Sequence, residues 1–409
     1  MTLETQSLTC LRKLAAVLAL TALTIVAARP SVAQTFTVLH TFTGPDGATP
    51  ESGLTMDRAG NLYGTALTGG QGFQYCNLGC GTIFKLTHGG SGWVFTPIYK
   101  FTGPDGANPR ARVVFGPDGA LYGTAVQGGA HGRGVVFKLQ PPATFCHAVQ
   151  CLWTEMVLYS FQQINDASYP AGGDLVFDNA GNIYGTTDDG GNFGGGTVYQ
   201  LVRSSGSWTE SVLHSFGASG DGWRPESGLT FDGQGNLYGT TSGGGSSQGG
   251  TVYQLTHSGS GWTESVIHSF DGNNEGSIPY GGLISDGAGN FYGTTNTGGP
   301  GFGGTVYELT PSSGGWTLNV LYSFSNIYVG SSASVTLGPN GALYGTLESA
   351  DVDVFQLTQS GGQWTQTGEF GRTNDGPDGN VILDAQGNLY TTGSAGGPNQ
   401  DGVVLEITP

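Results

Sequence analysis

Charged residues are scarce in this chain: they make up 11% of its 409 residues, against about 25% in an average soluble protein. Basic residues are the scarcest, because 13 Lys and Arg stand against 30 Asp and Glu and leave a net charge of −17. Without a basic stripe, the sequence offers no electrostatic basis for binding a phosphate backbone, which excludes a nucleic-acid partner. Hydrophobic residues make up 37%, so a folded core is expected and disorder by composition is excluded.

Long hydrophobic runs are also missing, apart from one near the N-terminus. Two basic residues precede an apolar run over residues 14–28, and the small residues Ser31 and Ala33 follow it. The run is shorter than the ~20 residues of a membrane-spanning helix, and its flanks are typical of a cleaved secretory signal. We therefore expect residues 1–33 to be a Sec-type signal peptide. Residues 34–409 are then an extracellular or periplasmic protein without a membrane span.

Cysteine is rare as well, with five in the whole chain. Four of them form two local pairs, Cys76 with Cys80 and Cys146 with Cys151. In an oxidising compartment each pair is predicted to form a disulfide. The alternative is a zinc site built from all four thiols, because zinc motifs use similar spacings.

Glycine, by contrast, is abundant, with 75 residues, which argues against helices because each interior Gly destabilises a helix by about 1 kcal/mol. Many of these glycines belong to a repeated motif, Gly-Asn-Leu-Tyr-Gly-Thr, or close variants of it. In the seventh copy, Thr391 replaces the second Gly. Copies spaced by about 46–62 residues are typical of propeller blades. The motif tyrosines are Tyr63, Tyr122, Tyr184, Tyr238, Tyr292, Tyr344 and Tyr390.

Each repeat unit contains four short β-branched and aromatic segments separated by Gly clusters, which predicts four strands, A to D. The chain begins with a lone D-type segment, residues 36–42, and its last unit, residues 381–408, lacks one. The sequence therefore predicts an all-β fold: a seven-bladed β-propeller of four-stranded blades, closed by the N-terminal strand in the last blade. We expect that strand to bury Val38, Leu39 and Phe42, and we expect a monomer.

With its repeated Gly-Asn-Leu-Tyr-Gly-Thr and Trp-Thr-Glu-Ser-Val-Leu-His-Ser-Phe segments, the chain resembles the GloVer tandem-repeat family of exported bacterial proteins. The resemblance covers essentially all of residues 34–409. It implies a bacterial extracellular or surface protein. It implies no activity or catalytic residues, so function must be argued from the loops.

The D-to-A and B-to-C loops vary in length and carry aromatic residues outside the repeat pattern. Flat aromatic faces beside polar groups suit neutral sugars, although such rings also serve to hold Gly-rich loops in place. The ligand-binding candidates are Trp223, Arg224, Tyr169, Tyr280, Tyr75 and Arg110.

Glu51 and Glu226 open the A strands of blades one and four, nearly opposite each other across the predicted channel. Such carboxylates could serve acid–base chemistry or hold Ca²⁺, although the repeated Pro-Glu-Ser-Gly-Leu is also explained as a solvated strand start. His40, His214 and His268 occupy a D-strand position that other copies fill with Tyr, which indicates a packing role rather than metal binding.

Two function classes follow from these patterns. The first is a secreted binding module for polysaccharide or a surface protein, with no cofactor. The second is an extracellular lyase or hydrolase acting on carbohydrate through Glu51 and Glu226, with or without Ca²⁺.

Overall fold

The computed structural model describes residues 35–71, 76–90, 92–142, 153–162, 166–170, 172–259, 261–325, 330–348, 354–370 and 379–408. The chain divides into the unit Phe36–Thr408, which forms the fold, and a second unit, Met1–Thr35 with Pro409. The predicted signal peptide, Tyr75, Cys146 and Cys151 lie outside the described residues.

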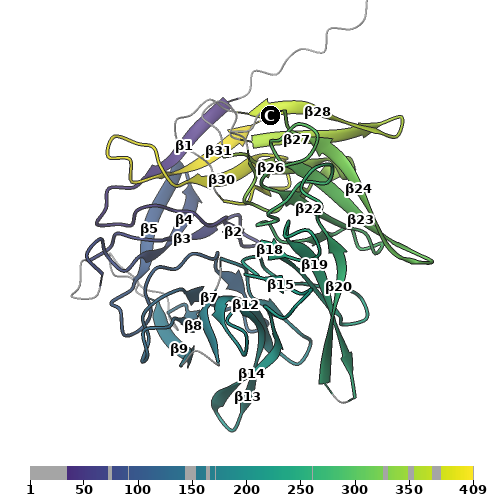
Figure 1. Ribbon diagram of the computed structural model, residues 1–409. Helices are drawn as coiled ribbons and strands as arrows, with labels where there is room; N and C mark the ends of the chain where they lie inside the picture. Colours follow the sequence, from purple (N-terminus) through teal and green to yellow (C-terminus); the bar gives the residue numbers. More distant parts are fainter. Residues whose placement is uncertain are drawn as a thin grey trace, which may run out of the picture. The chain divides into compact units, whose positions relative to one another are not determined.

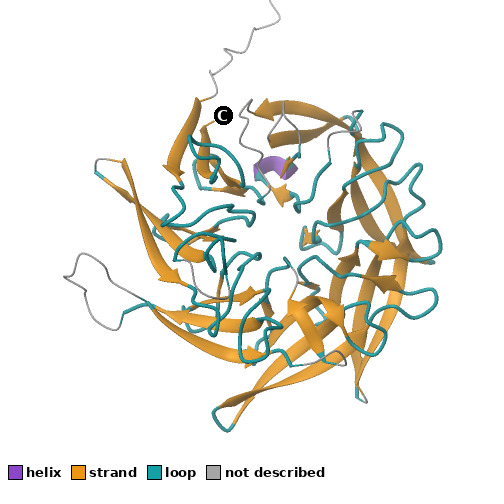
Figure 2. Cartoon of the chain, turned by 60° about the vertical axis from the view of Figure 1, so that its left-hand side comes forward, coloured by secondary structure: helices purple, strands orange, loops and turns teal. Residues whose placement is uncertain are grey.

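Seven antiparallel sheets form the blades of a β-propeller and are arranged in a ring (Figure 2), so the predicted fold is confirmed. The innermost A strands of blades one to seven are β2 (Thr55–Met56), β6 (Val114–Phe115), β11 (Val176–Phe177), β16 (Thr230–Phe231), β21 (Ile284–Ser285), β25 (Thr336–Leu337) and β29 (Ile382–Leu383). The B strands are β3 (Leu62–Ala66), β7 (Leu121–Ala125), β12 (Ile183–Gly190), β17 (Leu237–Thr241), β22 (Phe291–Thr295), β26 (Leu343–Thr346) and β30 (Leu389–Gly393).

Strands C and D form the outer half of each blade and are consecutive in the chain in blades one to six. The C strands are β4 (Thr82–Gly89), β8 (Val135–Gln140), β13 (Thr197–Ser204), β19 (Thr251–Ser258), β23 (Thr305–Ser312), β27 (Val354–Ser360) and β31 (Val403–Thr408). The D strands are β5 (Gly92–Lys100), β9 (Thr154–Ser160), β14 (Ser207–Ser215), β20 (Gly261–Ser269), β24 (Gly315–Ser323), β28 (Gln363–Phe370) and, for blade seven, β1 (Thr35–Thr41).

Three short strands and one helical turn complete the described part of the chain. β10 (Ala167–Pro170) adds a fifth strand to blade three beside β12, and β15 (Gly222–Trp223) pairs with β18 (Gly243–Gly244). A 3₁₀ turn, η1 (Pro339–Gly341), precedes β26. No helix among the described residues is long and apolar enough to cross a membrane.

The N-terminal strand closes the ring as predicted, because β1 lies beside β31 in the sheet of blade seven (Figure 1). The Phe42 N–H donates to the Gly402 carbonyl at 3.0 Å, and the Phe42 side chain is fully buried. The expected burial of Val38 is wrong, since it is 50% exposed. The last seven residues of β14, the D strand of blade three, have the same burial pattern as β1. In blade three, a bulge in the neighbouring C strand between Val198 and Tyr199 interrupts the alternation of buried and exposed side chains.

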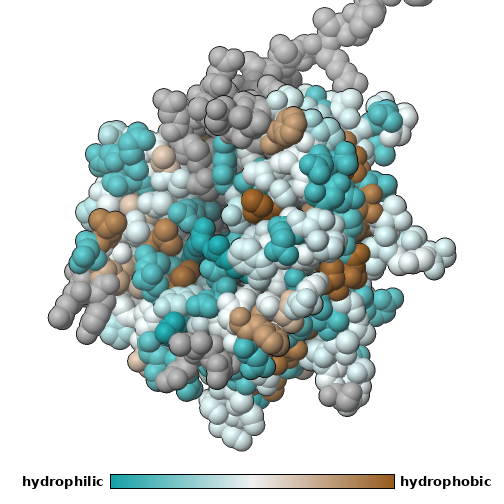
Figure 3. Space-filling model, in the orientation of Figure 1, coloured by the Kyte–Doolittle hydropathy of each residue, from teal (hydrophilic) through white to brown (hydrophobic). Residues whose placement is uncertain are grey.

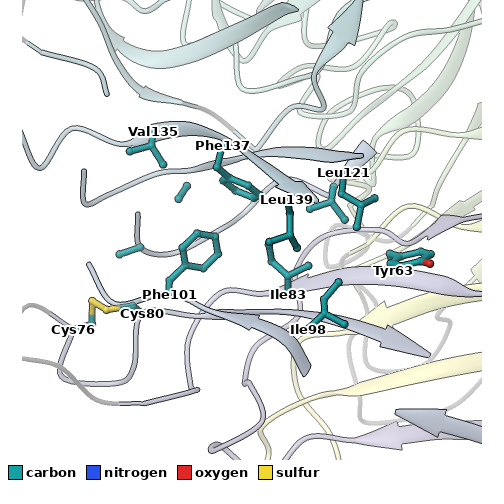
Figure 4. Packing of buried hydrophobic residues seen from close by; sticks show 13 residues of the cluster. Tyr63, Cys76, Cys80, Ile83, Ile98, Phe101, Leu121, Val135, Phe137 and Leu139 are labelled. Carbon is teal, nitrogen blue, oxygen red and sulfur yellow. A yellow bond between two sulfur atoms is a disulfide. The ribbon is translucent and has the colours of Figure 1, made fainter. Parts of the chain in front are cut away.

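The hydrophobic core lies between blades, with one cluster of buried residues at each of the seven boundaries. Between blades one and two, Phe101 and Phe137 pack edge to face with their ring centroids 5.2 Å apart (Figure 4). Tryptophans that open D strands reach the preceding blade, as where Trp262 meets Tyr184 at 6.0 Å. Each blade is therefore stabilised chiefly by its neighbours.

The repeat motif serves the turn between strands A and B. The Asp57 carboxylate accepts hydrogen bonds from the backbone N–H groups of Ala59 and Asn61 and from the Tyr63 hydroxyl at 3.1 Å. Although burial alone would raise it, these hydrogen bonds hold the pKa of Asp57 below its usual value. The same turn recurs at Asp178, Asp232 and Asp384.

In blades one, three, four, five and seven, the threonine that ends the motif joins the blade to the next one. Thr186 donates its hydroxyl hydrogen to the Ser227 carbonyl at 2.8 Å, and Thr294 donates to Ala333 at 2.9 Å. In blade seven the same bond runs from Thr392 to the Ser52 carbonyl of blade one. The ring is thus closed near its axis as well as at its outer edge.

Cys76 and Cys80 form the predicted disulfide, and both side chains are buried (Figure 4). Because this bond uses two of the four thiols, the zinc site built from all four is wrong. The predicted bond between Cys146 and Cys151 falls outside the described residues.

Candidate functional site

A cavity of about 1090 Å³ opens where the A strands begin, at the mouth of the central channel. We call the residues that line it the channel mouth. Its polar lining comprises Glu51, Ser52, Arg110, Arg112, Asp174, Arg224, Glu226, Ser227, Thr230, Tyr280, Ser285, Asn296, Ser332, Ser334, Thr336, Glu348 and Asn380.

The residues at the channel mouth follow a backbone conformation that recurs in five blades. In blades one to five, a non-glycine residue with positive φ precedes a proline; in blade four this residue is Arg224, with φ 60°. Its N–H donates to the Gly195 carbonyl of blade three at 2.7 Å, and its carbonyl accepts from the Ser242 N–H at 3.0 Å. A residue held in this region costs about 1–3 kcal/mol and persists only in a rigid surround. The mouth is therefore a preformed frame.

Arginines of blade two pair with carboxylates of both neighbouring blades. The Arg110 Nε lies 3.3 Å from Glu51 Oε2 of blade one. Two residues further along the chain, before β6 begins, Arg112 Nε donates to Asp174 Oδ2 of blade three at 2.6 Å. Both pairs are partly open to solvent, so they present donors and acceptors without a large net charge.

A second ionic cluster centres on Arg224, which contacts Asp188 at 2.9 Å and Glu226 at 3.1 Å. Burial and the charge of Asp188 raise the pKa of Glu226, and Arg224 offsets part of this effect. The charge of Arg110, two blades away, also acts on Glu226. Burial and the charge of Glu226 raise the pKa of Tyr280. These side chains therefore form one electrostatic unit in the cavity.

Five of the residues singled out from the sequence line the channel mouth: Glu51, Arg110, Arg224, Glu226 and Tyr280. The two glutamates come from blades one and four, as expected, but each has its own arginine partner.

Tyr169 and Trp223 lie outside the cavity lining. The Tyr169 ring carries the Arg133 guanidinium 5.1 Å from its centroid, and its hydroxyl accepts from Arg133 at 3.2 Å, so Tyr169 holds a loop of blade two. The Trp223 ring lies against Gly243, where a Cβ would fall 2.4 Å from Trp223 Cε2. Trp223 is nevertheless 42% exposed, and its role in ligand binding stays a prediction.

Sequence reasoning missed Arg112 and Glu348. Arg112 could have been found, because it lies two residues after Arg110 in the segment that leads into strand A of blade two. Glu348 accepts a hydrogen bond from Ser332, and the Ser332 hydroxyl accepts from Asn296 at 3.2 Å. Asn296 and Glu348 follow strand B of blades five and six, and Ser332 precedes strand A of blade six, so only the folded ring brings them together at the mouth.

Solved structures with a similar fold are distant in sequence. A fungal alcohol oxidase of the AA5 family, in complex with copper, is 15% identical, with a TM-score of 0.55 over 92% of this chain and 76% of that chain. PorZ, a surface component of the type-IX secretion system of Porphyromonas gingivalis, is 14% identical, with a TM-score of 0.54 over 90% of this chain and 47% of that one. At these identities the likeness shows the fold alone.

The repeat itself is more specific. Comparison with curated proteins gives no match. The Gloeobacter/Verrucomicrobia repeat, however, matches residues 24–152 and 152–352, which is more than half of the chain. This match agrees with the seven motif copies and with the blades that they form. The chain therefore belongs to the Gloeobacter/Verrucomicrobia repeat family.

Proposed function

We propose that this protein is an exported binding module whose channel mouth binds the neutral sugars of an extracellular polysaccharide. The observation that carries the proposal is the pairing of charges in the cavity, where Arg110, Arg112 and Arg224 each face a carboxylate. Paired charges leave many donors and acceptors but little net charge, which suits hydroxyl groups better than ions.

The size and lining of the cavity support the same ligand class. Its volume of about 1090 Å³ slightly exceeds the roughly 300–1,000 Å³ of typical small-molecule sites, which favours several sugar rings over one. Tyr280 offers an aromatic face on which a sugar can stack. The face shown in Figure 3 is largely hydrophilic or of neutral hydropathy, with small separate hydrophobic patches, as is usual around a polar ligand site.

Glycan-array screening followed by calorimetry with the best ligand tests this function. Tyr280→Ala should weaken binding by about 1–3 kcal/mol, the usual range for an aromatic anchor. Phe302→Ala is the matched control, because Phe302 is 67% exposed and lies outside the cavity lining. Equal losses in both variants, or binding to no glycan while a surface protein binds, would refute the proposal.

The second candidate function is that of an enzyme acting on carbohydrate, and the environment of Glu226 favours it. Its pKa is raised by burial, and its Oε2 is buried without a hydrogen-bond partner among the described residues. A carboxyl of this kind can serve as a general acid or base. Ca²⁺ bound by Glu51 and Glu226 would have to compete with Arg110 and Arg224, so this candidate is better stated without the ion.

A single assay distinguishes the two candidate functions. A binding module releases no product from its ligand, whereas a lyase or hydrolase releases shortened chains that mass spectrometry detects. If product forms, Glu226→Gln should abolish it while leaving the melting temperature close to that of the wild type. Product formation that persists in this variant would exclude Glu226 as the acid or base.

A further inference from the structure

A polar contact recurs at the boundaries between blades, far from the channel mouth. A D-strand His or Tyr hydrogen-bonds to an acidic residue in the loop that follows it. The described pairs are His40 with Asp46, Tyr99 with Asp105, Tyr159 with Asp166, His214 with Asp221, and His268 with Glu275. The next blade supplies a third side chain to this position: a glutamate in blades two to four (Glu155, Glu210 and Glu264), Phe95 in blade one and Leu318 in blade five.

One boundary combines a histidine with two carboxylates. Between blades three and four, where β14 and β20 lie side by side (Figure 1), Glu264 joins His214 and Asp221. At the boundary of His40, the third side chain is Phe95, stacked on the imidazole at 3.5 Å. In β24 the same register holds Leu318, which pairs with Leu309 as Glu264 pairs with Leu255.

The geometry of this triad is close to that of a metal site. One donor atom from each of His214, Asp221 and Glu264 lies within 4.8 Å of the others, and His214 Nε2 is 3.0 Å from Asp221 Oδ2. Donors around a tetrahedral zinc ion with bonds near 2.1 Å lie about 3.4 Å apart. Small side-chain rotations would therefore suffice to form the site.

The surroundings hold two of the ligands in place and leave the third without a partner. Asp221 Oδ1 accepts from the Gly222 N–H at 2.6 Å, which directs Oδ2 toward His214, and only 8% of the Asp221 side chain is exposed. Glu264 Oε1 is buried and has no hydrogen-bond partner among the described residues. The equivalent oxygens of Glu155 and Glu210 are also buried without a partner, but at those boundaries a Tyr stands in place of His214. An unpaired buried carboxylate oxygen is costly, and of these three glutamates only Glu264 has an imidazole beside it to share a cation.

We propose that His214, Asp221 and Glu264 bind a Zn²⁺ ion that clamps blade three to blade four. One imidazole and two carboxylates form a donor set that suits Zn²⁺, whereas Ca²⁺ and Mg²⁺ prefer oxygen ligands alone. The fourth position would be open to water. The site is separate from the channel mouth, so it is independent of the function proposed above.

The test is calorimetric titration of the chelator-treated full chain with ZnCl₂, paired with melting curves. We expect one equivalent of Zn²⁺ to bind and to raise the melting temperature. His214→Tyr introduces the Tyr that two other boundaries have at this position, Tyr99 beside Asp105 and Tyr159 beside Asp166. Glu264→Leu introduces the residue that β24 has there, Leu318. Both variants copy other boundaries of the same ring, so both should fold. Each should weaken zinc binding by about 100-fold or more.

His268→Tyr is the matched control, because its boundary has Leu318 in place of the third ligand. This variant should bind zinc as the wild type does. The proposal is overturned by a wild type that binds no zinc, by zinc binding that survives His214→Tyr, or by an equal response to CaCl₂.

Discussion

The second glycine of the repeat motif is required by the side chain that lies across from it in strand C. A Cβ on Gly239 would fall 2.4 Å from the Tyr253 hydroxyl oxygen, and one on Gly64 would fall 2.4 Å from Phe84 Cζ. In blade seven, Thr391 takes this position and faces Leu405, which is shorter than an aromatic residue. The exception in the sequence therefore has a packing cause.

Gly239→Ala should lower the free energy of unfolding by about 1–3 kcal/mol, because the methyl group overpacks the fully buried Tyr253. Chemical denaturation of the variant and the wild type measures the difference. Gly233→Ala is the control in the same blade, since a Cβ there meets nothing within 4 Å. If the two variants are equally stable, this steric account of the motif is wrong.

Single residues also mark the limit of what the sequence predicts. Glu51, Arg110 and Glu226 could be predicted at the channel mouth because they open the A strands of their blades. The contact of Glu264 with His214 was not predictable, since the two residues lie in different blades and only the docking of β20 on β14 joins them. The sequence alone indicates a packing role for His214, because other copies of the repeat have Tyr at its position.

At the scale of strands, counting repeat segments predicted all seven sheets, because hydrophobic period and turn residues mark each strand. It could not predict the bulges between strands C and D of blades one to six, nor the exposure of Val38. It also missed the β15–β18 pair, which consists of three glycines and Trp223 and carries no strand signal. The local sequence pattern predicts the number of strands, whereas the direction of a side chain depends on the partner strand.

The D strands also determine how stability depends on pH. Burial and the charge of Asp105 raise the pKa of Glu155 to about 7 from an ordinary 4.5. Burial and a hydrogen bond with Asp166 raise the pKa of Glu210 to about 8. Tyrosines also interact electrostatically with these two carboxyl groups: Tyr99 with Glu155, and Tyr159 and Tyr199 with Glu210.

Because the folded state binds these two protons more tightly than the unfolded chain, their contribution to stability is complete below pH 4.5 and is lost as the pH rises to about 8. The melting temperature in EDTA should therefore fall between pH 5.5 and 8.5, by on the order of 2–5 °C. Glu155→Gln combined with Glu210→Gln should reduce this dependence, and the rest is expected from Glu264, whose pKa burial and the charge of Asp221 raise to about 7. An unchanged slope in the double variant would show that other groups cause it.

At the scale of the whole molecule, two contacts at different radii close the ring. Near the axis, Thr392 donates to the Ser52 carbonyl, and both residues are buried. Thr392→Val keeps the shape but removes the donor, so it should destabilise the protein by about 1–3 kcal/mol, the cost of an unpaired buried carbonyl. Denaturation curves should show a similar loss in Thr240→Val, which breaks the equivalent bonds to Pro279 and Gly281. A much smaller effect at Thr392 would mean that this closure contact contributes little.

At the outer edge, closure depends on β1. Deleting residues 34–42 removes the fully buried Phe42, whose ring lies 5.3 Å from that of Phe84 and 5.6 Å from that of Phe95. It also uncovers the edge of β31, and exposed strand edges promote aggregation. Burial is worth about 1.5–3 kcal/mol for each large apolar side chain, which is a substantial part of the roughly 5–15 kcal/mol that stabilises a typical domain.

The deletion variant should therefore melt far below the wild type or aggregate, as calorimetry and size-exclusion chromatography would show. Val38→Ser is the control in the same strand, because Val38 is 50% exposed and its change should leave the melting temperature within about 1 °C. Blades one and seven have further contacts, including Trp93 with Tyr390 at 5.9 Å. If those contacts alone hold the ring, the truncated protein will stay monomeric with an unchanged melting curve, and β1 will be an addition to the propeller rather than its closure.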